Sequence, residues 1–353
     1  MALGGGVFVT QNKVLPGAYI NFVNASNATA AIGDRGVVAI PYAIGKAAGT
    51  IVEVTKTEFL KDSVSVLGIE YGSDTAKPLR EIFAHATKCI IYDMGAGADA
   101  KTATDAINAL EPYDFNVLAA YTSTTTDTTT YVTAVKTWRD AGKKCQVVVY
   151  GGGEAATTKF NHEGVINVVS TATDEGATGH ELVAWVAGAE AGCAINASCT
   201  NMIYDGEYTV KCDKTQAQLE KCMEDGQLVF HLVYGDVRVL EDINSLTEIT
   251  ADKGEDFKMN QTIRVIDQVA NDIAKLFNTK YLGKIPNNAS GRVSLWGDIV
   301  AHHRELETIQ AIENFDANLV TVEQGETKRA VVVNDAIQVV NAMSQLYMTI
   351  VIQ

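Results

Sequence analysis

Short apolar runs alternate with helix-like stretches through the middle of the chain. The runs occupy residues 88–93, 115–120, 146–150, 165–170 and 228–233. Helical patterns fall between them at 100–110, 128–140, 181–194 and 214–225. Strands that are apolar on both faces and alternate with helices are typical of a parallel sheet covered on both sides. The pattern predicts a central α/β domain over residues 88–245.

The chain before this domain divides into two parts. Residues 1–25 are predicted to form an N-terminal arm, with a Gly-rich start, a Pro16-Gly17 turn and a short strand over 18–23. Residues 26–87 are expected to form a small αβ segment. Its strands lie at 36–41 and 50–54 and its helices at 57–67 and 78–86, the second with Pro78 at its first position.

The last hundred residues follow a different pattern. Residues 260–277 carry one apolar stripe at helical spacing, and a second helix is expected over 294–310. Strands are predicted at 328–334, 336–340 and 347–352. We therefore expect a C-terminal α+β domain over 246–340 and a C-terminal arm strand over 341–353. The predicted fold class is a multi-domain combination of α/β and α+β parts with extended arms at both ends.

Composition and charge exclude several classes of protein. The 353 residues, 47% of them hydrophobic, are enough for two or three domains and too apolar for a disordered chain. The formal net charge of −15 disfavours binding to nucleic acid or to anionic lipid. The start of the chain lacks a signal-peptide pattern, and the most apolar stretch, residues 182–195, is too short to span a bilayer. We expect a protein that stays in the cytoplasm and does not insert into a membrane.

One loop offers an enzymatic alternative. Gly95-Ala96-Gly97-Ala98-Asp99-Ala100 follows a strand and precedes a helix, where a dinucleotide fingerprint would stand. The acidic residue expected after the next strand is missing, so ordinary turn chemistry is the competing interpretation. A nucleotide-binding α/β enzyme built on Gly95–Ala100 remains the alternative function.

Other candidate chemistry is sparse. His302 and His303 are adjacent on a predicted helix and point about 100° apart, unlike the i, i+4 pair that chelates one ion. The six cysteines form no CxxC pair, and reduced thiols are expected, although Cys193 and Cys199 could meet Cys212 or Cys222. No catalytic residue, metal ligand or cofactor-binding residue is predicted.

The two chain ends offer strands that could pair with another sheet. In the last one, Met348, Ile350 and Ile352 lie on one face, and the other face is also largely apolar. Such a strand can close its own sheet or be donated to a neighbour. The periodicity does not separate these two possibilities.

Several blocks resemble the contractile-tail sheath family of long contractile phage tails and R-type bacteriocins. The N-terminal block is Leu15-Pro16-Gly17-Ala18-Tyr19-Ile20-Asn21-Phe22, and Gly33-Asp34-Arg35-Gly36 opens the Arg-Gly block that follows. The C-terminal part adds Val239 to Thr247, Arg264-Val265-Ile266-Asp267, Gly283-Lys284, Gly291-Arg292 and Ala342-Met343 to Ile350. A self-assembling surface-layer protein is a third possibility, against which the missing signal peptide argues.

The resemblance implies a mechanical function without enzymatic activity or cofactor. Subunits of the family stack as hexameric rings around an inner tail tube, between baseplate and terminator proteins, and contract to drive the tube through a target envelope without nucleotide hydrolysis. They assemble in the bacterial cytoplasm and join by exchanging terminal strands. That role falls here on Ala18, Tyr19, Ile20, Phe22, Met348, Ile350 and Ile352. The possible tube contacts are Lys258, Arg264 and Lys275.

Overall fold

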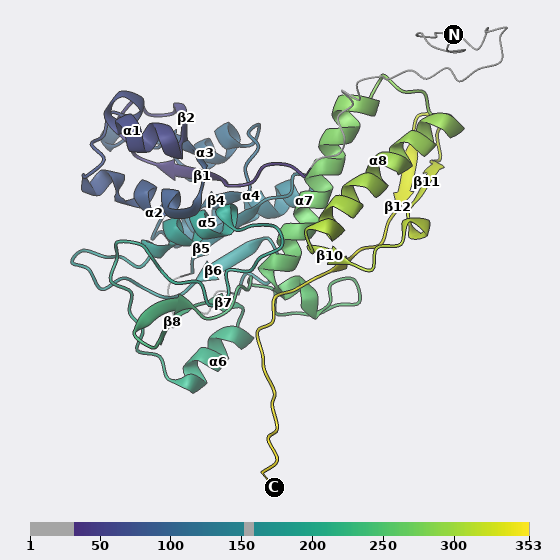
Figure 1. The fold of residues 1–353 in the computed structure, drawn as a ribbon. Coiled ribbons are helices and arrows are strands. Elements are labelled where there is room, and N and C mark those ends of the chain that lie inside the picture. The colour runs from purple at the N-terminus through teal and green to yellow at the C-terminus, as the bar shows by residue number, and fades with distance from the viewer. Residues whose placement is uncertain (1–31, 152–158, 353) are drawn as a thin grey trace, which may run out of the picture.

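A computed structural model describes residues 32–151 and 159–352, and its central feature is one seven-stranded sheet (Figure 1). The strand order is β2-β3-β1-β4-β5-β6-β7. These strands are β1 (Val37–Tyr42), β2 (Ile51–Thr55), β3 (Lys88–Asp93), β4 (Val117–Ala119), β5 (Gln146–Tyr150), β6 (Val165–Val168) and β7 (Gln227–Leu228). Neighbouring strands are parallel except at one edge, where β2 runs antiparallel to β3.

Helices cover both faces of this sheet, as the alternating pattern predicts. One face packs against α1 (Lys56–Leu67), α2 (Lys77–His85) and α5 (Leu182–Gly192). The other face packs against α3 (Ala103–Leu110) and α4 (Thr125–Asp140). Helix α5 is buried along its whole length from Leu182 to Ala191. The longest apolar stretch of the sequence is therefore a core helix. No described helix is long and apolar enough to cross a bilayer.

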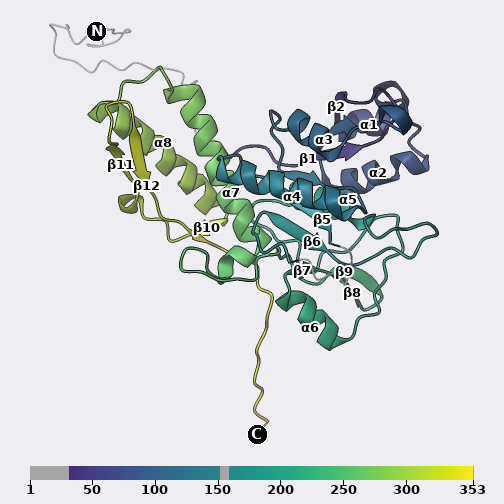
Figure 2. The same cartoon turned by 180° about the vertical axis from the view of Figure 1, so that it is seen from behind.

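The C-terminal part stands beside the sheet as a helical pair with small strands (Figures 1 and 2). Helix α7 (Asn260–Leu276) leads away from the sheet, a π-helical turn (Phe277–Tyr281) follows, and α8 (Ala289–Thr308) returns. The hairpin of β11 (Thr321–Gln324) and β12 (Val331–Asn334) packs along α8, and β10 (Ile312–Glu313) pairs with β13 (Gln338–Val339). The remaining described elements are α6 (Gln216–Glu224), β8 (Phe230–Val233), β9 (Asp236–Val239) and short 3-10 turns.

Three details differ from the sequence prediction. Residues 26–87 are expected to form a segment separate from the α/β domain that begins at residue 88. In the structure, β1 and β2 of that segment belong to the same sheet as β3 to β7. The strand expected over 228–233 is split: β7 ends the sheet, and β8 turns away to form a hairpin with β9. Residues 347–352 form no strand within the subunit, because no described strand lies beside them.

Candidate functional site

Helix α7 buries its polar face as well as its apolar face. Its buried polar side chains are Asn260, Gln261, Thr262, Arg264, Asp267, Gln268 and Asp272. The polar stripe of an amphipathic helix usually faces water. Here it faces charged groups of the α/β layer and of the segments that border it. The contact between the two parts of the chain is therefore a polar junction, and we treat this junction as the first candidate functional site.

Arg264 forms the centre of a fully buried cluster in this junction. Its guanidinium donates to Glu190 Oε2 at 2.6 Å, to the Ala197 carbonyl at 2.6 Å and to Asp242 Oδ2 at 3.3 Å. The Asn260 amide donates to the other Glu190 oxygen at 3.2 Å. Glu190 comes from α5, whereas Asp242 follows β9, so one arginine joins three separate parts of the chain.

Burial determines how these acids are charged. Burial, reinforced by the charge of Asp242, holds the pKa of Glu190 well above its ordinary value. Burial also acts to raise the pKa of Asp242, but Arg264 and surrounding hydrogen-bond donors outweigh it and leave that pKa lowered. The cluster thus places two acidic side chains around one guanidinium, and burial disfavours the charged form of Glu190 but not that of Asp242.

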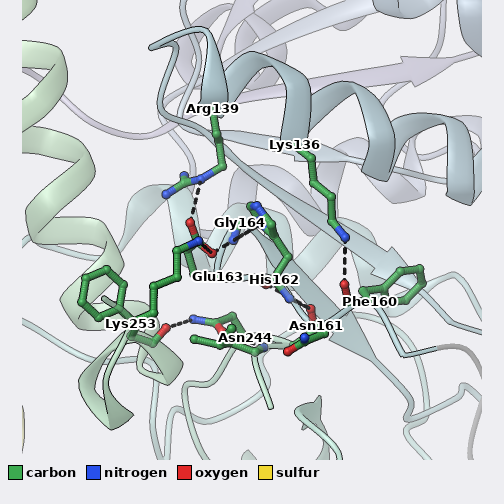
Figure 3. A network of polar contacts seen from close by, with 12 residues as sticks. Lys136, Arg139, Phe160, Asn161, His162, Glu163, Gly164, Asn244 and Lys253 are labelled. Carbon is green, nitrogen blue, oxygen red and sulfur yellow. Dashed lines mark hydrogen bonds and ion pairs between the residues drawn. The ribbon is translucent and has the colours of Figure 1, made fainter. Parts of the chain in front are cut away.

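A second ion pair lies further along α7, at the end of α4. Arg139 donates to both carboxylate oxygens of Asp267, at 2.5 and 2.8 Å, and to the Cys145 carbonyl at 2.9 Å. Its Nε lies 4.0 Å from Glu163, which also accepts from Lys253 Nζ at 2.8 Å (Figure 3). Two-pronged Arg–carboxylate contacts fix direction as well as distance. This pair therefore sets the angle at which α7 meets α4.

The β5–β6 connection completes the network of Figure 3. His162 Nδ1 accepts from the Gly164 amide at 2.9 Å, and burial together with nearby cations lowers the pKa of His162 to about 4. Asn161 Oδ1 accepts from the amides of Thr247 and Glu248, each at 2.9 Å. His162 is therefore neutral at pH 7. Asn161 connects the segment that precedes α7 to the β5–β6 connection through two hydrogen bonds.

The charged groups of this junction contact one another. The carboxylates of Glu163, Asp242 and Asp267 all accept hydrogen bonds from cations of the protein itself. Glu190, Cys199 and Asp242 have the spacing of metal ligands, but Arg264 already provides the cation among them. Buried ion pairs specify a geometry more than they add stability. The junction is suited to holding two rigid parts in one relative orientation.

The structure corrects one of the three expected tube contacts. Arg264 has no exposed side-chain surface, because Glu190 and Asp242 surround it. Lys258 is partly exposed and pairs with Glu255 at 3.1 Å. Lys275 is exposed near the outer end of α7. The sequence-based assignment assumed that the polar face of α7 looks outward, and for Arg264 this was wrong.

The Gly95–Ala100 loop begins with a turn in which the Gly95 amide binds the side chain of Asp93, two residues earlier. Asp93 accepts from the amides of Gly95 at 2.9 Å, Lys46 at 2.8 Å and Ala47 at 2.9 Å. The next helix begins only at Ala103, where the side chain of Thr102 caps its first turn. Within the loop, the Gly95 amide is thus bonded to Asp93, and the Ala100 amide donates to the Gly97 carbonyl at 3.3 Å.

The two chain ends differ in what can be said of them. Ala18, Tyr19, Ile20 and Phe22 lie outside the described residues. At the other end, Gln261 donates to the Val340 carbonyl at 3.0 Å and accepts from the Ala342 amide at 2.9 Å. Beyond this point the chain runs away from the body (Figure 1). In residues 346–352, the end of this C-terminal tail, the apolar side chains are between 71% and 92% exposed: Leu346, Tyr347, Met348, Ile350, Val351 and Ile352.

A group of cations lies at the outer end of the helical pair, where sequence reasoning made no assignment. Residues 273–297 contain four Lys or Arg and no Asp or Glu, although the whole chain carries −15. A cavity of about 280 Å³ at this end is lined by Arg292, Lys328 and Arg329 beside apolar side chains such as Leu282 and Ile285. Among the described residues, no carboxylate pairs with these three cations or with Lys284. We call Lys284, Arg292, Lys328 and Arg329 the basic tip.

The remaining candidates of the sequence fall within the core. His302 and His303 are fully buried, and their rings turn toward each other despite their adjacent positions. Cys199 is buried beside the half-buried Cys193, whose pKa falls to about 7 because Cys199 and Arg264 stabilise the thiolate. Neither cysteine is bridged to Cys212 in the described chain.

Two family models match consecutive parts of the chain. Residues 96–245 match the central domain of phage tail sheath proteins, and residues 252–353 match the phage tail sheath C-terminal domain. The uncharacterized protein YqbK of Bacillus subtilis is 30% identical over 234 residues, covering 63% of this chain and 49% of that protein. The tail sheath protein of Clostridium phage phiCD119 is 29% identical over 222 residues, covering 62% of this chain and 59% of that protein. The chain spans about half the length of the curated relatives it matches.

Solved structures share the whole architecture. A sheath tail protein from Desulfitobacterium hafniense superposes with a TM-score of 0.79 at 24% identity, covering 93% of this chain and 97% of the other. The contracted helical sheath of the anti-feeding prophage gives a TM-score of 0.72 at 14% identity, covering 96% of this chain and 99% of the other. At these identities the likeness is one of fold.

Proposed function

The chain belongs to the phage tail sheath family, and from this membership we propose that it polymerises into a contractile sheath around an inner tube. In this proposal the subunits stack as hexameric rings, and shortening of the sheath drives the tube through a target envelope. The sheath assembles in the bacterial cytoplasm and becomes part of a phage or bacteriocin particle. The likeness to the baseplate and sheath assemblies of the anti-feeding prophage supports partners of this kind.

Energy for the movement is proposed to come from contacts between subunits and not from nucleotide hydrolysis. The loop that suggested a nucleotide site, Gly95–Ala100, uses its Gly95 amide to bind Asp93. The polar junction supports a rigid-body movement, because it fixes α7 against the α/β layer while neighbouring subunits slide.

The exposed C-terminal tail is the observation that supports assembly most directly. Its apolar side chains lie outside the body, and its hydrogen bonds to the body end at Ala342. A solvent-exposed apolar strand would aggregate unless another sheet covered it. We propose that Met348, Ile350 and Ile352 pack on a neighbouring subunit, and that the N-terminal residues Ala18 to Phe22 make the reciprocal connection.

Deletion of residues 347–353 tests this proposal. Because Gln261 anchors the chain at Val340 and Ala342, the shortened protein should unfold within about 1 °C of the full chain, a shift no larger than that expected from about 1 kcal/mol. It should also fail to form tubes. Calorimetry measures the first result, and sedimentation with negative-stain microscopy measures the second. Tubes of normal diameter from the shortened protein would refute donation of the strand.

A matched control distinguishes an effect specific to the tail from a general effect of removing exposed apolar side chains. Leu60 and Val64 on α1 are each 55% exposed and lie far from the tail in sequence. The double variant Met348→Asp with Ile350→Asp should block polymerisation, whereas Leu60→Asp with Val64→Asp should leave it intact. If both double variants polymerise equally, the tail has no special role.

A further inference from the structure

Two neighbouring histidines lie buried between the points where both terminal segments join the helical pair. His302 Nε2 lies 3.0 Å from Asp272 Oδ2 on α7. His303 Nε2 lies 2.5 Å from Asp335 Oδ2, in the link between β12 and β13. The Nδ1 atoms of the two rings face each other at 3.3 Å. Both histidine side chains are inaccessible to solvent.

The hydrogen-bond partners determine how many protons the pair carries. Asp272 also accepts from the Gly33 amide at 3.1 Å and from Gln268 Nε2 at 2.9 Å, so all its neighbours are donors, as an ionised carboxylate requires. Each Nε2 that faces a carboxylate must therefore carry a proton. Two Nδ1 atoms in contact need one further proton between them, since two lone pairs or two N–H groups would repel. Three protons on four ring nitrogens make one imidazole and one imidazolium.

Two carboxylates face this single positive charge, so the buried group is negative overall when both are ionised. The carboxylates that face it are Asp272 from α7 and Asp335 from the β12–β13 link. Arg35 is linked to the site through Gln268, to which it donates at 3.3 Å and which donates to Asp272 at 2.9 Å. Glu307 is engaged by the Phe315 amide at 3.0 Å, and the Phe315 ring packs edge-on against His303.

Both carboxylates lie on segments that lead to a chain end. Asp272 binds the amide of Gly33, close to where the described chain begins. Asp335 precedes β13, whose Val339 packs with Val265 and Leu306 just before the tail departs. The two histidines of α8 thus lie between two segments. His302 contacts Asp272, which binds the start of the described chain, and His303 contacts Asp335, which lies shortly before the C-terminal tail.

We propose that His302 and His303 form a proton clasp, in which one shared proton holds both terminal segments against α8. Without that proton, two nitrogen lone pairs would face each other at the Nδ1 contact and repel. With one proton more, two N–H groups would face each other there and repel. Either change loosens the segments around Gly33 and Asp335 together. The clasp can be tested on the unassembled subunit.

The proton count can be measured by NMR on the full chain with ¹⁵N-labelled histidine. Two-bond ¹H–¹⁵N correlations near neutral pH distinguish protonated from unprotonated ring nitrogens, and His302→Gln and His303→Gln assign the signals. One unprotonated nitrogen among the four is expected. Two unprotonated nitrogens, which would mean two neutral rings, would overturn the proposal, and so would none.

Hydrogen exchange tests the consequence for the chain ends. In His303→Gln the amide can still donate to Asp335, but the Nδ1 contact is gone, so protection of residues 33–36 and 335–340 should fall about tenfold relative to the native chain, whereas peptides of β5 should keep their protection. His231→Gln on β8 is the matched control and should behave like the native chain. Native protection of both segments in His303→Gln would refute the clasp.

Discussion

Removing the guanidinium of Arg264 would leave Asp242 as a buried carboxylate without a cation. Breaking one member of a buried ion pair costs about 3–5 kcal/mol, because the remaining charge cannot reach water. Arg264→Met should therefore lower the free energy of unfolding by about that amount in urea titrations. Glu190→Gln should cost less, because burial raises the pKa of Glu190 and so disfavours its charged form, and the amide oxygen of glutamine can still accept from Arg264. Equal losses in the two variants would contradict this difference.

His162 gives the protein a defined response to acid. Burial lowers its pKa to about 4, below the value of about 6.5 expected in the unfolded chain. Folding therefore favours the neutral ring, so this stability is complete above about pH 6.5 and is lost as the pH falls toward 4. His162→Asn offers an oxygen to the Gly164 amide and cannot be protonated. The unfolding free energy of this variant should decrease less between pH 7 and pH 4.5 than that of the native chain, and parallel pH profiles would exclude His162 as the cause.

At the scale of elements, helices α2 and α5 approach so closely that their contact depends on two glycines. A Cβ on Gly188 would stand 2.4 Å from the Ile82 carbonyl, and one on Gly192 would stand 2.3 Å from the His85 carbonyl. Alanine at either position must push the helices apart. This widens the core on one face of the sheet, because α5 is buried along its length.

Gly188→Ala is therefore expected to be destabilising although alanine favours helices. The gain in helix propensity is at most about 1 kcal/mol, whereas forcing backbones apart in a packed core costs about 1–3 kcal/mol or more. Thermal unfolding should show a lowered Tm. Gly297→Ala on α8 is the matched control, since a Cβ there meets no atom within 4 Å, and it should leave the Tm unchanged or raise it. A lowered Tm in the control alone would contradict the packing argument.

At the scale of the whole molecule, charge is distributed unevenly. The chain carries −15 overall, yet the basic tip gathers four cations at the outer end of the helical pair. Such an isolated patch attracts an acidic surface and weakens with salt. We propose this face, together with the exposed Lys275, as the contact for the inner tube.

Charge reversal tests this assignment. Lys284→Glu with Arg329→Glu should abolish co-assembly with the tube protein while self-assembly and Tm are retained, because both side chains are exposed. Lys61→Glu with Lys101→Glu changes the net charge equally on exposed residues of the α/β part and should have no effect. Equal loss of co-sedimentation in both variants would indicate a general effect of charge and not a contact at the tip.

The sequence by itself determined the order of elements and the class of fold. Short apolar runs such as residues 146–150 favour strands buried on both faces, and the stripe on α7 favours a packed helix, because local period and burial are linked. It also marked the tail from Tyr347 to Ile352 as apolar on both faces. These features depend on residues close together in the chain, which is why pattern alone could reveal them.

Only the tertiary structure decided where the polar face of α7 lies. Arg264 meets Glu190 across 74 residues and Asp267 meets Arg139 across 128, so no local pattern shows that these charges are complementary. The same holds for the central place of β1 between β3 and β4, and for the two histidines that share a contact with carboxylates 30 and 32 residues away. Which charged side chains form ion pairs across such distances depends on how the helices and strands pack. Only packing brings these opposite charges together in a contact without water.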